Sequence, residues 1–465
     1  MTAIITKKGP KHVPILGWRY RGLQMLKDPM KFFLDLNKTY GELCFWDPKY
    51  PKHLCLFGAE MNKYVFSKPE IFIVDAFRES KLPRNSSIER LSFGLMRLNG
   101  EEHKRHRKLM QPAFRSAVID KYWHAIVEET RKELSDWQYY ETRDINKDLI
   151  RLVTHISLKT MFGTKNNDNY NYTKLQDLME ELLALATSPF NLLLPYALPG
   201  LPYHKMLRTA DSIEAIVKQI INEKKKSRGD DVLSELINSH NEGDDGLTED
   251  ELISEAYTVL CHESAAAALS WLIFLLDRHP RVHEKLMQEI SGLDGVPSVE
   301  EIKNLKFLDN VFKESLRLLP PSGFNLRYVS EDHEMNGMLI EKGSMVFLSS
   351  YVTHRIEPIF VEPLRFIPER WDDIQPTPYE YLPFGCGAHS CIGKYFAQLE
   401  IKLILIMILQ EFKLSCVENA VIDRGMRVSM VPKHGLKMTI HKFTDKISRS
   451  SLVGNIFESV EIEDE

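Results

Sequence analysis

The sequence has few cysteines, little net charge and no long uncharged apolar run. Its six cysteines are sparse and irregularly spaced along 465 residues, which argues against a disulfide framework and for a reducing compartment. A net charge of -5 gives no overall attraction to nucleic acid. The most apolar stretch, residues 399–409, is short and contains Glu400 and Lys402, whereas a membrane-spanning helix needs about 18 apolar residues. We therefore expect a soluble, cytoplasmic protein without a transmembrane anchor or a nucleic-acid partner.

The pattern along the chain predicts one large, mainly α domain with a minor β portion. Residues 42–46 and 53–57 are rich in strand formers and suggest a small hairpin. Apolar residues then recur at helical spacing from about 60 to 320, and short strand-like segments follow after Arg327. We find no repeat and no linker that divides the chain. Residues 444–465 are polar and end in acidic residues, so we expect a flexible tail there.

Residues 381–393 form a loop rich in cysteine and glycine before a long apolar helix. Cys391 lies where that helix begins, and the positive end of the helix dipole favours an anion at this position. The position is therefore expected to bias the cysteine toward its thiolate, the form that binds metals. Two alternatives stay open: Cys391 is a small buried core residue, or Cys386, His389 and Cys391 supply three ligands of a zinc site that lacks a fourth.

Glu314 and Arg317 lie three residues apart in a predicted helix and therefore on one face. An exposed ion pair of this kind is common and stabilises little. However, Arg370 follows in a loop shortly before the cysteine. A carboxylate between two guanidiniums could lock that loop to the helix through bidentate contacts.

A second predicted helix, residues 249–276, is almost wholly apolar after Tyr257 and should be buried. Glu263 and Ser264 stand in its middle, and a buried carboxylate is costly unless it has a partner. The serine could also bond to the carbonyl four residues earlier and bend the helix. A zinc-protease motif is excluded, because Ala266 occupies the place of the second histidine. A capped or water-satisfied pair in a large core remains the alternative.

Basic residues cluster at positions 103–108, where His103 and Arg107 share one helical face. This face is either simply solvated or a clamp for an anion such as a carboxylate. Arg327 is another isolated cation next to apolar residues.

Together these segments resemble the cytochrome P450 family of haem-thiolate monooxygenases over nearly the whole chain. The cysteine loop is similar to the family signature at five positions: Phe384, Gly387, His389, Cys391 and Gly393. The family's Glu-x-x-Arg helix is matched by Glu314 and Arg317, and its Pro-Glu-Arg segment by Arg370. The resemblance implies a single P450-like haem domain over residues 1–443, with residues 444–465 as the tail.

The resemblance also implies the cofactor and its ligands. Haem b would bind with Cys391 as the proximal iron ligand, which favours O–O cleavage. His103, Arg107, Arg327 and His389 would hold its propionates. Glu263 and Ser264 fall at the acid–alcohol pair that helps to deliver protons during oxygen activation. The chain departs from the family pattern at Leu260, Cys261, Ser264 and Ala265, and we hypothesise that Cys261 narrows or reshapes the oxygen-side groove.

No flavin or iron–sulfur domain is apparent, so electrons from NAD(P)H would arrive through a separate ferredoxin or flavodoxin. The basic set Lys104, Arg105, Lys108 and Lys394 could attract such an acidic donor. The segments expected to line the substrate pocket are apolar, which suggests a fatty, terpenoid or polyketide-like substrate. The residues that we expect to line this pocket are Phe72, Phe77, Phe190, Leu192 and Phe324. Two further functions stay open: a haem-thiolate peroxygenase, isomerase or dehydratase, and a non-catalytic haem- or zinc-binding protein.

Overall fold

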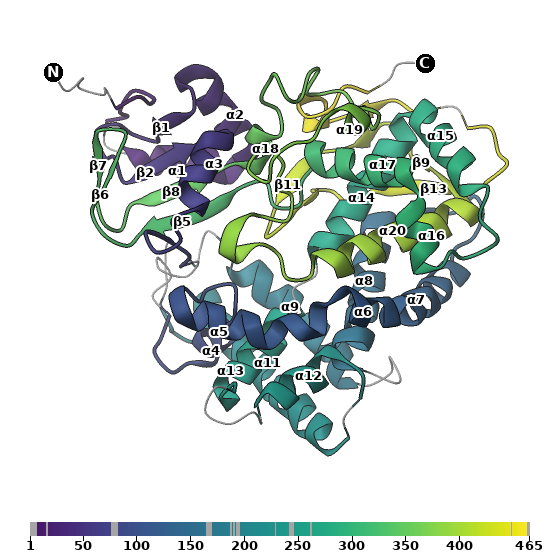
Figure 1. Ribbon diagram of the computed structural model, residues 1–465, viewed down its shortest axis with the longest axis horizontal. Coiled ribbons are helices and arrows are strands. Elements are labelled where there is room, and N and C mark those ends of the chain that lie inside the picture. The colour runs from purple at the N-terminus through teal and green to yellow at the C-terminus, as the bar shows by residue number, and fades with distance from the viewer. Residues whose placement is uncertain are drawn as a thin grey trace.

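The protein is mainly helical with several small sheets, as the sequence predicts. The computed structural model describes residues 7–14, 17–75, 82–163, 170–186, 188, 191, 196–227, 229–240, 246–260, 263–447 and 449–462. In Figure 1 the largest sheet and the N-terminal helices lie at the upper left, and the long helices fill the right and lower parts.

The α-helices follow the apolar spacing predicted for the middle of the chain. They are α1 (Trp18–Lys27), α2 (Pro29–Tyr40), α3 (Ala59–Phe66), α4 (Ser87–Leu91), α5 (Gly100–Met110), α6 (Ser116–Ile119), α7 (Trp123–Ser135), α8 (Ile145–Phe162), α9 (Tyr170–Ala186), α11 (Pro202–Lys226), α12 (Val232–His240), α13 (Glu249–Thr258), α14 (Glu263–Arg278), α15 (Pro280–Ile290), α16 (Val299–Asn304), α17 (Lys306–Leu318), α18 (Ser350–Thr353), α19 (Arg370–Asp373) and α20 (Lys394–Glu411).

The strands are short, and all but β4 lie before residue 75 or after residue 324 among the described residues. They are β1 (Leu43–Phe45), β2 (His53–Leu56), β3 (Phe72–Ile73), β4 (Thr142–Asp144), β5 (Asn325–Val329), β6 (His333–Met335), β7 (Met338–Ile340), β8 (Met345–Leu348), β9 (Phe412–Cys416), β10 (Ala420–Val421), β11 (Arg424–Met426), β12 (Met430–Pro432), β13 (Lys437–Lys442) and β14 (Leu452–Val453). The five-stranded sheet has the order β1-β2-β8-β5-β3. The predicted hairpin is present, since β1 and β2 pair antiparallel, and β2 also pairs in parallel with β8.

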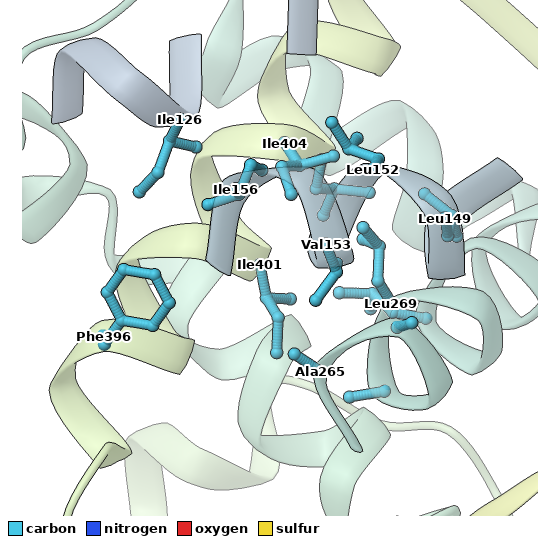
Figure 2. Close-up of a cluster of buried hydrophobic side chains, with 14 of the residues drawn as sticks. Ile126, Leu149, Leu152, Val153, Ile156, Ala265, Leu269, Phe396, Ile401 and Ile404 are labelled. Atoms are coloured by element: carbon cyan, nitrogen blue, oxygen red, sulfur yellow. The ribbon is translucent and has the colours of Figure 1, made fainter. Parts of the chain in front are cut away.

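The core forms where α8, α14 and α20 meet (Figure 2). Leu152 of α8, Leu269 of α14 and Ile404 of α20 are all almost completely buried. In α8 the buried residues Leu149, Leu152 and Ile156 recur every three or four positions, which produces one apolar face. Helix α20 is buried over most of its length, as its continuous apolar sequence requires. This packing fixes α14, which begins at Glu263, relative to α20, which begins just after Cys391.

The long apolar helix predicted for residues 249–276 is divided into α13 and α14. Helix α13 begins with a capping box, in which the Thr248 hydroxyl accepts a hydrogen bond from the Glu251 N–H and the Glu251 carboxylate accepts one from the Thr248 N–H. At its other end the Thr258 hydroxyl donates to the Ser254 carbonyl at 2.9 Å. The sequence suggested that the Ser264 hydroxyl could form a bond of this type. A hydroxyl bonded to the carbonyl four residues earlier favours a bend in the helix. Cys261 lies outside the described residues.

The stretch Glu249–Arg278 is long and apolar enough to cross a membrane, but 81% of its most apolar window is buried inside the protein. Its composition therefore fits a core position.

The C-terminal segment differs from the flexible tail that we expected. Residues 449–462, called the C-terminal strap below, add strand β14 beside β10. Ile456, Ser459 and Val460 are at most 1% exposed. In Figure 1 this yellow segment runs along the top of the molecule near α19. The polar composition predicted a flexible tail. Three buried residues and the pairing of β14 with β10 instead hold this segment against the rest of the protein.

Candidate functional site

The loop that carries Cys391 is held in a tight turn before α20. Gly385 and Gly387 have φ values of 69° and 70°, a left-handed conformation that glycine adopts readily. A Cβ on Gly387 would lie 2.9 Å from the Phe66 carbonyl oxygen, so the close approach also requires glycine. The Cys391 N–H donates to the Phe384 carbonyl at 2.8 Å and closes the loop. The Cys391 side chain is exposed, whereas Cys386 is buried.

The electrostatics of Cys391 differ from the thiolate bias predicted from its position. One side of the thiol is open to solvent, but the protein packed around its other sides removes enough water to raise its pKa. This desolvation outweighs the Gly393 N–H and the positive charges of Arg107 and Lys394. A thiolate at this position therefore needs a further positive charge, such as a metal cation at the sulfur atom.

A zinc site receives no support from the structure. The described part of the chain contains no group of three or more histidine, cysteine, aspartate or glutamate side chains placed to hold a metal. Cys386 turns into the core, and burial raises its pKa. Cys391 is thus left without the two protein partners that a zinc site would require.

Four basic side chains gather beside the cysteine loop: His103, Arg107, Arg327 and His389. The rings of His103 and His389 lie 4.1 Å apart between centroids. Burial, together with the neighbouring positive groups, lowers the pKa of His103 to about 4 and that of His389 to about 3. Burial also lowers the pKa of Arg327 to about 10. The region is therefore short of negative charge.

The acceptors that these four groups have are neutral. Arg107 donates to the carbonyl and hydroxyl of Ser390 at 2.8 and 3.2 Å, and Arg327 donates to its neighbour's carbonyl at 2.8 Å. The buried His103 Nε2 has no hydrogen-bond partner. Among the described residues, none of the four forms an ion pair with a carboxylate. An anionic group next to Cys391, such as a haem propionate, would fit this set.

A buried ion cluster fixes the segment before the loop to α17. The Glu314 carboxylate accepts two hydrogen bonds from Arg317, both at 2.9 Å, and one from Arg370 at 2.9 Å. The carboxylate and the Arg317 side chain are completely buried. Burial alone would raise the pKa of Glu314, but the two guanidiniums and the Ile367 N–H lower it overall. The carboxylate therefore stays charged, and the arrangement acts as a rigid clamp.

Two residues of this cluster were not found from the sequence. The Trp371 indole donates to Glu314 at 3.0 Å. His354 connects the clamp to the cysteine loop, because its carbonyl accepts from Arg317 and its Nε2 accepts from the Leu382 N–H, both at 3.0 Å. Burial lowers the pKa of His354 to about 3, which keeps this nitrogen available as an acceptor. Neither residue belongs to a spacing pattern that could have revealed it.

Glu263 is the first residue of α14 and is half-buried. Its Oε2 has no hydrogen-bond partner. Burial raises the pKa of this carboxyl group; Arg427 opposes that effect and Glu180 adds to it. Ser264 is exposed. The predicted pair therefore combines an acid that holds its proton more tightly than usual with an accessible hydroxyl group.

Some sequence expectations about the surroundings change. Phe72 is almost completely buried in the core beside the five-stranded sheet, and the Phe324 ring lies 5.2 Å from that of Phe33, so both pack in the core. Phe77, Phe190 and Leu192 lie outside the described residues. In the basic set, Lys104, Lys108 and Lys394 are exposed. Lys104 forms an exposed ion pair with Glu101 at 2.7 Å, and Arg105 is paired with Glu251.

Comparison with known proteins agrees with this geometry. A family model described as Cytochrome P450 matches residues 8–439. Cyclooctat-9-en-7-ol 5-monooxygenase of Streptomyces melanosporofaciens is 28% identical over 88% of this chain and 89% of its own. Cytokinin hydroxylase of Arabidopsis thaliana is 27% identical over 88% and 82%. The solved structure of retinoic acid-bound cyanobacterial CYP120A1 has a TM-score of 0.80 and 25% identity, covering 94% of this chain and 99% of its own.

Proposed function

The chain belongs to the cytochrome P450 family and is an oxidoreductase, and we propose that it inserts one oxygen atom of O₂ into an apolar organic substrate. The observation that carries this proposal is an exposed Cys391 thiol beside four basic side chains without carboxylate partners. A haem, when bound, supplies the redox and oxygen chemistry. The protein's own residues bind the cofactor, fix its ligand and move protons.

Haem b fits the side chains around the cysteine loop. Cys391 is the proposed iron ligand, and the positive charge of the iron would offset the burial that raises the pKa of this thiol. His103, Arg107, Arg327 and His389 are the proposed partners of the two propionates. The unpartnered Nε2 of His103 supports a ligand that accepts a hydrogen bond there.

The glycines and the clamp hold the cysteine in place. Gly387 allows the close approach to Phe66, and the Cys391 N–H bonded to Phe384 fixes the turn. Among the described residues, no atom lies within 4 Å of where a Cβ on Gly393 would lie, so the start of α20 is uncrowded at this position. The ion cluster around Glu314, with Arg317 and Arg370, limits movement of the segment that leads into the loop.

Glu263 and Ser264 are the proposed proton-transfer pair on the oxygen side. A carboxyl group with a raised pKa retains its proton closer to neutral pH, which suits a general acid. The exposed Ser264 hydroxyl can accept that proton and donate its own. Serine lacks the threonine methyl group that restricts χ1, so its orientation is less fixed.

Electrons are proposed to come from NAD(P)H through a separate ferredoxin- or flavodoxin-type protein. The exposed Lys104, Lys108 and Lys394 support an acidic partner. We also propose a cytoplasmic location. The substrate is proposed to be mostly hydrocarbon, in line with the cyclooctat-9-en-7-ol and retinoic acid named for two similar proteins.

The test compares the parent protein with Cys391→Ser. The parent, reduced and exposed to carbon monoxide, should show the red-shifted absorption band of a thiolate-bound haem, and Cys391→Ser should lose it. Ferredoxin, its reductase and NADPH should then support incorporation of ¹⁸O from ¹⁸O₂ into a bound hydrocarbon. A Cys386→Ser control should keep the band, because the Cys386 side chain is buried in the core beside the five-stranded sheet.

The outcome also separates the alternatives. Turnover with hydrogen peroxide but not with O₂ and electron donors would favour a peroxygenase. A parent protein that binds haem without the thiolate band would contradict the proposed function altogether.

A further inference from the structure

The C-terminal strap, residues 449–462, lies beyond the part of the chain that matches the family model, which ends at residue 439. It is nevertheless bonded to the body of the protein at several points. The Arg278 guanidinium donates to the Ser450 carbonyl at 2.9 Å, and the Ile422 N–H donates to the Val453 carbonyl at 2.8 Å. The side chain of Asn455 accepts from the Arg424 N–H at 2.7 Å. These contacts lead the strap toward the clamp around Glu314.

At the clamp the strap completes a row of five hydrogen-bonded carbonyls, residues 361–365. Arg370 donates to the first two carbonyls at 2.7 and 3.4 Å. Arg317 donates to the third and the fifth at 2.8 and 3.0 Å. The fourth carbonyl accepts from the backbone N–H of Glu461 in the strap at 2.9 Å. The strap and the two clamp arginines thus hold the same five residues.

The strap also supplies acceptors to buried positive charges beside α17. The Arg355 guanidinium donates to the Ser459 carbonyl at 3.0 Å and to the Leu318 carbonyl at 2.6 Å. Arg424 forms an ion pair with Glu458 at 3.0 Å. Arg355 and Arg424 are at most 8% exposed, and a buried cation that loses an acceptor is costly. The strap therefore stabilises the end of the helix that carries Glu314.

We propose that the C-terminal strap is a positioning element for the haem-ligand loop. By holding the fourth carbonyl of residues 361–365, it keeps that segment in register with Arg317 and Arg370. The clamp then holds the loop that presents Cys391, so the strap acts on thiolate ligation from a distance. This inference rests on the proposed role of Cys391 as the iron ligand.

The test uses a matched pair of substitutions at one position. Glu461→Pro removes the N–H that bonds to residue 364, because proline has no amide hydrogen. Glu461→Ala keeps that N–H and changes only an exposed side chain. A shortened chain that lacks residues 461–465 removes the same donor without the proline ring, together with the Glu461 carbonyl that lies 3.1 Å from His279 Nε2. A chain that lacks residues 463–465 is its control.

Two properties are measured at a temperature well below unfolding: transfer of haem to apomyoglobin, and the share of the carbon monoxide complex with the thiolate band. Loss of the hydrogen bond between the Glu461 N–H and the Leu364 carbonyl should speed haem transfer by about threefold to tenfold and reduce the thiolate share. Glu461→Ala and the chain lacking residues 463–465 should match the parent.

The proposal is overturned if Glu461→Pro and the chain lacking residues 461–465 keep the parent's haem transfer rate and thiolate share. A lower unfolding midpoint with both properties unchanged would make the strap a general stabilising segment and would also overturn it. Failure of the proposed function is a separate result, because then the parent protein itself lacks the thiolate band.

Discussion

At the scale of single residues, opposite charge environments distinguish the buried Glu314 from the half-buried Glu263. Glu314 accepts from two guanidiniums, and its pKa is lowered. Among the described residues no guanidinium lies at hydrogen-bond distance from Glu263 Oε2, and burial raises the pKa of this carboxyl group. The Glu314 carboxylate is therefore kept charged at the clamp, whereas the Glu263 carboxyl group at the start of α14 favours its protonated form. This difference assigns the two residues different roles, one in positioning and the other in proton transfer.

Glu314→Gln should strongly destabilise the protein, because it leaves two buried guanidiniums without a counter-charge. Loss of one partner in a buried ion cluster costs about 3–5 kcal/mol, to be measured as the free energy of unfolding in urea at pH 7. The difference in unfolding free energy between the parent and Glu314→Gln should be largest above the ordinary pKa of glutamate. It should disappear as the pH falls through the lowered pKa of Glu314. Glu362→Gln, which affects an exposed pair with Arg365, is the control and should change stability little.

Glu263→Gln should have opposite effects on stability and on turnover. The amide removes the cost of a half-buried charge, so the unfolding midpoint at pH 8 should not fall. It cannot donate a proton as an acid, so product formed with O₂ should drop on the order of 100-fold. If Glu263→Gln loses turnover but keeps the thiolate band, the role of Glu263 in proton transfer is supported. Unchanged product formation would contradict that role.

The sequence could predict the contact of Glu314 with Arg370 and single out Cys391 as a candidate ligand, because the signature around each is local. It could not identify His354 or Glu461, which act through a ring nitrogen or a backbone group on segments remote in sequence. It also predicted a thiolate bias for Cys391 from the helix start. Burial, which depends on the whole fold, outweighs that local effect.

At the scale of secondary-structure elements, α20 carries an unpaired buried acid within its apolar length. Glu400 is 1% exposed, and its Oε1 has no hydrogen-bond partner. Burial raises its pKa from 4.5 to about 8. Burying Glu400 in α20 therefore costs little stability only while its carboxyl group is neutral.

Glu400→Gln should make stability less dependent on pH. In the parent, the contribution of neutral Glu400 is complete below about pH 4.5 and is lost as the pH rises to about 8. The slope approaches about 1.4 kcal/mol per pH unit within this window. Unfolding in urea at several pH values should show this slope for the parent and a smaller one for the variant. Glu411→Gln, at the exposed end of α20, should retain the parent's slope.

The division between α13 and α14 shows what element prediction misses. A continuous apolar pattern predicted one helix over residues 249–276, and burial of that region is correct. The end of α13 coincides with the Thr258 side chain bonded to the Ser254 carbonyl. Such competition between a side chain and the helix backbone does not alter hydrophobic periodicity, so a pattern search cannot detect it.

At the scale of the whole molecule, the chain's small negative net charge conceals local basic groups. Lys104 and Lys394 are exposed, and Lys394 adjoins the cysteine loop. The double variant Lys104→Glu/Lys394→Glu should slow reduction by an acidic ferredoxin by about tenfold at low salt. The difference should shrink as salt screens the charges.

Stopped-flow reduction at several salt concentrations measures this effect, with the exposed Lys342→Glu as a control distant in sequence. Equal rates for all three proteins at low salt would show that the donor docks elsewhere or without charge steering.

The parallel pairing of β2 with β8 also has a consequence for how the protein is made. These strands come from distant parts of the chain, and nearly the whole helical body lies between them in sequence. Contacts of such separation close late, since the intervening chain must first be ordered. During synthesis the hairpin of β1 and β2 forms before β8 has been made, so the edge of β2 that pairs with β8 stays unpaired until then. A brief need for chaperone protection at the ribosome follows, centred on the first strands to emerge.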